Sequence, residues 1–126
     1  MSYTYNQLIQ MFIDVTKQTK NVDYSDKASI REHNILVDKY RNIAQIINTN
    51  FPEHIKDFEL LLNSDDERTR ICCAVCIVEL FSTTLSEKQR AIDTINQYII
   101  SAEDKVEKMG LNIWLKNITG EMCNME

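Results

Sequence analysis

The chain has 126 residues with 19 acidic and 14 basic side chains, so its formal net charge is −5, and its length fits a single domain over residues 1–126. Only two glycines and one proline are present, so the tight turns of an all-β fold lack their usual residues and we expect an all-α domain. With 44% apolar residues the chain is not disordered as a whole, and its acidic balance disfavours nucleic acid as a ligand and favours a basic partner.

The first half of the chain predicts two helices with clear start signals. Thr4 followed by Gln7 forms a capping box, and the apolar stripe after it ends near Thr19. A polar break follows, after which Ser25 or Asp26 can cap a second helix whose apolar positions continue for about six turns. The sequence therefore predicts a helical hairpin at the N-terminus.

The middle of the chain predicts a short third helix and a fourth. Pro52 ends the second helix and begins the third, which ends at Leu62, because proline is tolerated in the first turn of a helix. Ser64 and Glu67 then form a second capping box, and the fourth helix runs to about Ser82.

The fourth helix is the expected centre of the fold. From residue 71 to residue 78 every side chain is apolar or cysteine, which leaves no solvated stripe. The two-residue spacing of Cys73 and Cys76 also occurs in zinc and redox motifs, but no second pair of ligands follows at motif spacing. We interpret Cys72, Cys73 and Cys76 as small buried core residues, and we expect no metal and no cofactor.

The last third of the chain predicts two more helices. Ser86 is the expected cap of the fifth helix, and Ser101 with Asp104 caps the sixth, which ends near Gly120. Gly110 interrupts the sixth helix, and a close approach to the cysteine-rich helix is the expected reason. Short links between the six helices predict three stacked antiparallel helical hairpins.

The segment from residue 60 to residue 80 resembles a HEAT repeat. A leucine-rich helix end is followed by an acidic turn, an arginine one helical turn later and a run of small residues. Asp66 and Arg70 occupy the acidic and arginine positions, and Thr69 departs from the pattern, which prefers valine. The resemblance implies a HEAT-like, right-handed α-α superhelix.

The whole arrangement also resembles a family of small bacterial HEAT-like proteins whose genes often lie beside toxin genes. The resemblance rests on this repeat and on residues 108–116, which include Trp114. It implies a cytoplasmic immunity protein that binds a cognate toxin domain, such as a cationic nuclease, and blocks its active site.

We therefore expect a binding protein and not an enzyme, with the partner contacting carboxylates along one rim of the stack. Charge complementarity would speed this association. The candidate contact residues are Glu32, Asp38, Asp65, Asp66, Glu67, Glu103 and Asp104, with Tyr40 as an aromatic anchor.

Two other functions remain open from the sequence. One is an adaptor or scaffold domain for a different protein partner, which the same helical surface would serve. The other is a small enzyme that uses glutamate with His33 or His54, or a cysteine metal site, although neither histidine lies in a recognisable catalytic motif. A cytoplasmic protein is the expectation, because no run of 18 apolar residues is present.

Overall fold

The computed structural model describes residues 3–19, 22–81 and 83–124, with side chains to residue 120, and this part of the chain is helical without a strand. The all-α prediction is confirmed. The helices are α1 (Tyr5–Lys17), α2 (Lys27–Asn50), α3 (Ile55–Glu59), α4 (Glu67–Leu80), α5 (Leu85–Ser101) and α6 (Lys105–Asn124). Turns of 3₁₀ helix, Pro52–His54 and Leu60–Asn63, flank α3.

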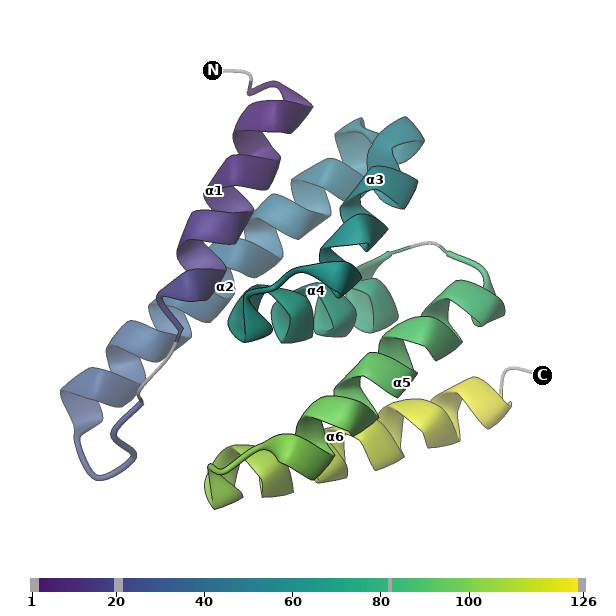
Figure 1. Cartoon of the computed structure of the whole chain (residues 1–126). Helices are drawn as coiled ribbons and strands as arrows, with labels where there is room; N and C mark the ends of the chain where they lie inside the picture. The colour runs from purple at the N-terminus through teal and green to yellow at the C-terminus, as the bar shows by residue number, and fades with distance from the viewer. Residues whose placement is uncertain (1–2, 20–21, 82, 125–126) are drawn as a thin grey trace.

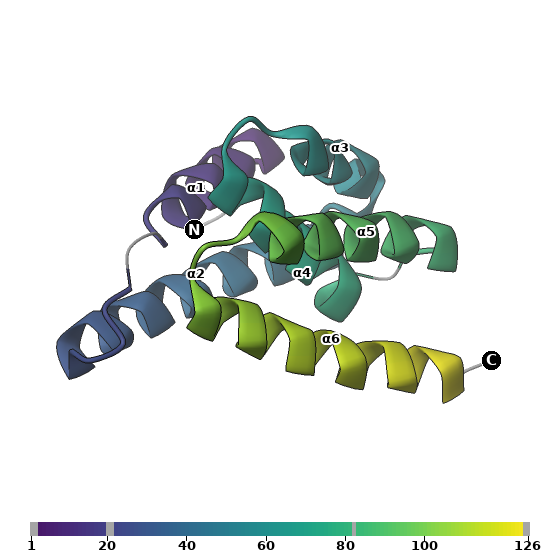
Figure 2. The same ribbon diagram turned by 60° about the horizontal axis from the view of Figure 1, so that its bottom comes forward.

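Helix α4 lies in the middle of the molecule, as its unbroken apolar run predicts. It packs against α1 and α2 on one side and α5 on the other, and α3 covers a further part of it (Figure 1). Cys73, Cys76 and Ile77 are fully buried, and Cys72 is 3% exposed. Figure 2 shows α6 at the edge of the molecule, against α5.

The start signals of α1 and α2 are confirmed. The backbone N–H of Gln7 donates to Thr4 Oγ1 at 3.2 Å, and the Thr4 N–H donates to Gln7 Oε1 at 2.9 Å, which completes the capping box. Of the two candidate caps of α2, the structure uses Asp26, whose Oδ1 accepts from the Ala28 N–H at 3.0 Å.

The caps of α4 and α5 differ from the predicted ones. Asp66 caps α4 by accepting from the Thr69 N–H at 3.0 Å, while the predicted cap, Ser64, accepts from the Asp66 N–H one turn earlier. Thr84, two residues before the predicted Ser86, caps α5. In both cases another capping residue lies close in sequence, so composition alone did not fix the first turn.

Helix α6 also departs from prediction at both ends. Asp104 Oδ1 alone accepts from the N–H groups of Val106 and Glu107, at 3.0 and 3.1 Å, without a capping contact from Ser101. Helix α6 continues past Gly120, which therefore does not end it.

Helix α4 ends at Leu80, and Ser82, where its end was expected, lies outside the described residues.

A pair of buried hydroxyl groups joins α1 to α4 where the HEAT pattern would place valine. Thr69 Oγ1 and Thr16 Oγ1 are 2.8 Å apart, and both residues are fully buried. Thr16 also donates to the carbonyl oxygen of Ile13 at 3.0 Å, so the Thr69 hydroxyl donates to Thr16. The polar departure at Thr69 is therefore matched by a polar residue on α1.

A buried carboxyl group lies at the end of α3. Glu59 is 8% exposed, and its Oε1 atom has no hydrogen-bond partner. Burial, together with a hydrogen bond to the Glu87 carboxyl and its charge, raises the pKa of Glu59 to about 7. Arg90 and Lys56 oppose this rise.

The threonine pair predicts non-additive stability changes. Thr16→Val should lower the free energy of unfolding by about 1–3 kcal/mol, because it leaves the buried Thr69 hydroxyl without an acceptor. Adding Thr69→Val should recover most of this loss, since no hydroxyl is then left unpaired. Urea unfolding of the two single variants and the double variant measures the coupling, and strictly additive changes would contradict it.

Glu59 predicts that stability falls as the pH rises. Its pKa is higher in the folded protein than in the unfolded chain, so the folded state gains stability below about pH 4.5 and loses it as the pH rises through about 7. Glu59→Gln should raise the Tm by about 3 °C or more at pH 8 and by less at pH 5. The control, Glu53→Gln, removes an exposed carboxylate and should match the wild type at both pH values.

Candidate functional site

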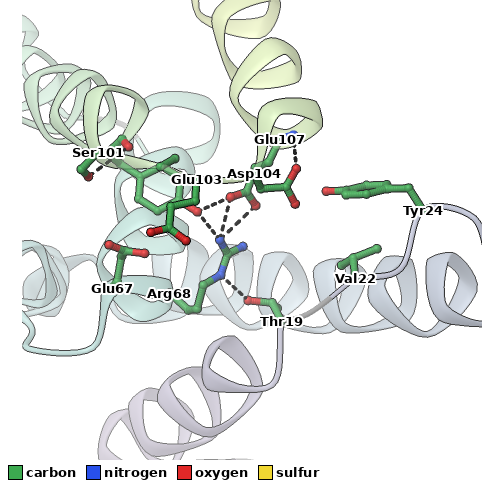
Figure 3. A pocket seen from close by; sticks show the side chains of 11 residues that line it. Thr19, Val22, Tyr24, Glu67, Arg68, Ser101, Glu103, Asp104 and Glu107 are labelled. Carbon is green, nitrogen blue, oxygen red and sulfur yellow. Dashed lines mark hydrogen bonds and ion pairs between the residues drawn. The ribbon is translucent and has the colours of Figure 1, made fainter.

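A cavity of about 550 Å³ opens where α1, α4, α5 and α6 meet. The first turn of α4, the chain after α1 and the turn between α5 and α6 form its walls (Figure 3). It is lined by Thr19, Val22, Tyr24, Glu67, Arg68, Tyr98, Ser101, Ala102, Glu103, Asp104 and Glu107. Four of these residues are acidic and one is basic, so we call this cavity the acidic compartment.

The guanidinium group of Arg68 connects helices from both ends of the chain. Its Nε donates to Thr19 Oγ1 at 3.0 Å, and one terminal nitrogen donates to the Tyr98 hydroxyl at 2.7 Å. The same nitrogen pairs with both carboxylate oxygens of Glu107, at 2.9 and 3.1 Å. The side chains of Arg68 and Glu107 are only 12% and 20% exposed, so this ion pair is largely desolvated.

The surroundings of Arg68 favour its charged form. Burial opposes the charged form of Arg68, but Glu107, Cys72 and Tyr98 together outweigh burial, and the pKa of Arg68 is raised. The Tyr98 hydroxyl donates to the Glu107 carboxylate. Burial and this hydrogen bond raise the pKa of Tyr98. Figure 3 shows Tyr24 pointing toward the carboxylates of Asp104 and Glu107. Burial, Asp104 and Glu107 raise the pKa of Tyr24.

A second cavity of about 230 Å³ adjoins the first, between α2, α4 and α6. It shares Thr19, Arg68 and Glu107 with the acidic compartment, so the ion pair forms the wall between the two. Most of its other lining is apolar or aromatic, and we call it the apolar compartment; these residues are Val37, Tyr40, Ile71, Cys72, Val75, Leu111 and Trp114.

Polar groups also line the apolar compartment. Glu79 accepts from the Trp114 indole N–H and pairs with Arg41, so a carboxylate on α4 holds side chains of α6 and α2. Near Arg68 lies His33, whose Nδ1 is buried without a partner. Burial and the charge of Arg68 lower the pKa of His33, which favours the neutral imidazole at pH 7.

The structure brings together some of the sequence-predicted contact residues and separates others. Glu67, Glu103 and Asp104 line the acidic compartment. The remaining predicted carboxylates do not line either compartment: Glu32 and Asp38 are exposed on α2, Asp65 is exposed before α4, and Asp66 caps α4.

Tyr40, predicted as an aromatic anchor, is buried and offers little surface to a partner. Tyr40 is 7% exposed, and its ring packs edge-on against Phe12 with the ring centroids 5.8 Å apart. Its helical spacing also fits the buried face of α2, and that face holds it. Tyr24, which is 41% exposed at the mouth of the acidic compartment, presents an aromatic surface there instead.

Arg68, Tyr98 and Glu107 were missed by sequence reasoning. The HEAT pattern directs attention to Arg70, which donates to the Ser64 carbonyl oxygen at 2.7 Å and has a local role. One signal was present for Glu107, which lies four residues before Leu111 and therefore on the same face of α6. A carboxylate on a buried helix face indicates that a cation lies close to it in the fold.

The cysteines are buried in the core, and His54 packs against an aromatic ring. Burial raises the pKa of Cys72 to about 11 and that of Cys73 and Cys76 well above the usual value, so these thiols stay protonated at pH 7. Their interpretation as buried core residues is confirmed. His54 stacks on Tyr5, with ring centroids 4.3 Å apart. Within the described residues no group of three or more His, Cys, Asp or Glu side chains could hold a metal ion.

Comparisons with protein-family models, curated proteins and solved structures returned no match. Among the described residues, no helix combines the length and the apolar character needed to span a bilayer.

The buried ion pair predicts a stability difference between two neighbouring glutamates. Glu107→Gln should lower the free energy of unfolding by about 1–3 kcal/mol, because Arg68 then remains buried without a counter-charge. Glu103→Gln removes an exposed carboxylate from the same compartment and should change stability by less than about 0.5 kcal/mol. Urea unfolding at pH 7 measures both, and equal losses would contradict a special role for the pair.

Proposed function

We propose that this protein is a binding module that receives a basic segment of a protein partner in the acidic compartment. The observation that carries the proposal is the convergence of Glu67 with Glu103 and Asp104, from two places distant in sequence, around one cavity. Glu107 is neutralised by Arg68, so the acidic character comes from these three carboxylates. The net charge of −5 adds a long-range attraction for a basic protein.

The adjoining apolar compartment supports a macromolecular partner over a free cation. A partner that places a lysine or arginine side chain in the acidic compartment can also offer an apolar side chain to the adjoining compartment, whose lining includes Trp114 and Val75. Interfaces combine such apolar anchors with charged groups that direct the approach. The Arg68–Glu107 pair between the compartments is already formed and needs no rearrangement on binding.

Within this class of function, the proposed role is that of an immunity protein in the cytoplasm. A nuclease toxin must bind phosphate groups, so its active site is rich in Lys and Arg. An acidic cleft complements such a surface, and occupying it would exclude the nucleic acid. Catalysis by the present chain has no part in this proposal.

The scaffold of the proposal is a HEAT-like stack of three hairpins. The extensive contact of α1 with α2 and the contact of α5 with α6 support this pairing, although α4 packs more extensively on α5 than on α3. In this arrangement α4, α5 and α6 together bring their ends to the acidic compartment.

The test compares two triple variants that remove the same number of carboxylates. The cleft variant is Glu67→Gln, Glu103→Gln and Asp104→Asn, in which asparagine can still cap α6. The control variant is Glu32→Gln, Asp38→Asn and Asp65→Asn, outside the cleft. Basic proteins that co-purify with the tagged chain from its native host are purified and titrated against each variant by calorimetry.

The cleft variant should weaken binding by about tenfold or more and reduce its salt dependence, whereas the control should weaken it by less than about threefold. Equal loss in both variants, or binding that strengthens with salt, would overturn the proposed site. For the immunity role, co-expression with the partner should restore growth of cells that the partner kills. If binding persists without such protection, the adaptor function replaces it.

A further inference from the structure

The outward face of α6 carries apolar side chains that have no cover in the described part of the chain. Val106, Met109 and Ile113 are 55%, 64% and 57% exposed. They lie at intervals of three and four residues, so they form one stripe along the helix. The opposite face packs on the core through Leu111, Trp114, Leu115 and Ile118. Helix α6 is therefore apolar on both faces, and only one face is buried.

Gly110 borders this stripe and has no function in the packing of the single chain. The expected close approach to α4 is wrong, because no atom lies within 4 Å of the position that a Cβ atom would occupy. A glycine inside a helix costs about 1 kcal/mol relative to alanine. Close approach of another surface to α6 would explain why a glycine stands at this position.

The stripe is complementary to itself in the antiparallel direction. Met109 and Gly110 are adjacent, and Val106 and Ile113 lie at equal distances on either side of their midpoint. Glu103, two residues before α6 begins, and Lys116 are both exposed, are equally far from this midpoint in the sequence and carry opposite charges. In an antiparallel pair of α6 helices, a large side chain would therefore face glycine at the centre. Apolar side chains would face each other on either side, and opposite charges would face each other at the ends.

We propose that two copies of this chain associate through α6, antiparallel, about a two-fold axis that passes between Met109 and Gly110. In such a symmetric interface each contact occurs twice. Met109 of each copy packs over Gly110 of the other, Val106 meets Ile113, and Glu103 lies beside Lys116. Antiparallel α6 helices also align their dipoles favourably.

The apolar stripe of this interface lies outside the proposed partner cleft, and Glu103 alone belongs to both surfaces. The residue of α6 that belongs to the wall between the two compartments, Glu107, faces Arg68 and the interior. One helix per copy gives a small contact, so we expect a dimer that forms at concentrations between about 10 μM and 1 mM.

Sedimentation velocity of the full chain across this concentration range tests the proposal. The wild type should shift toward twice the monomer mass, and Ile113→Glu should raise the dimer dissociation constant by about tenfold or more. The matched control is Ile35→Glu, because Ile35 is a similarly exposed isoleucine, 50% exposed on α2. A wild type that stays monomeric, or a dimer equally weakened by both variants, would overturn the proposal.

Two further variants test the register. Gly110→Ala should raise the Tm, because alanine favours the helix, and at the same time weaken the dimer by about threefold or more. Lys116→Glu should weaken the dimer, and adding Glu103→Lys should restore it. A Gly110→Ala variant with an unchanged dimer, or a double variant no better than Lys116→Glu alone, would overturn this register. Ile113→Glu, Gly110→Ala and Lys116→Glu leave all three cleft carboxylates in place, so these variants test the dimer independently of partner binding.

Discussion

The ion pair between Arg68 and Glu107 is the interaction on which the site depends. One guanidinium group on α4 binds a hydroxyl at the end of α1, a phenol on α5 and a carboxylate on α6. Because these partners come from distant parts of the chain, Arg68 links α5 and α6 to the end of α1. The pair also divides the cleft, since both compartments end at the same two side chains.

Local structure was largely readable from the sequence, because its determinants lie within a few residues. The Thr4 capping box, the Asp26 cap and the buried cysteine-rich helix follow from side-chain chemistry over one or two helical turns. Where prediction missed the first turn, as at Thr84, two capping residues competed within three positions. Short-range rules identify such a boundary only to within a turn.

The site was less predictable, because its contacts are long-range. Arg68 is 30 residues from Tyr98 and 39 from Glu107 in the sequence, and no helical spacing relates residues so far apart. The acidic residues were recognised as a group, but only the fold selects Glu67, Glu103 and Asp104 from among them. Tyr40 shows the same limit, since its spacing places it on a helix face without saying what covers that face.

The fixed position of Trp114 has an optical consequence. It is the only tryptophan of the chain, and its indole N–H is bound to a carboxylate while its ring lines the apolar compartment. Indole emission depends on the polarity and mobility of its surroundings, so the protein carries an intrinsic fluorophore in the wall of its own cleft. A molecule that displaces solvent from that wall therefore changes the fluorescence of Trp114, and no attached label is needed to detect it.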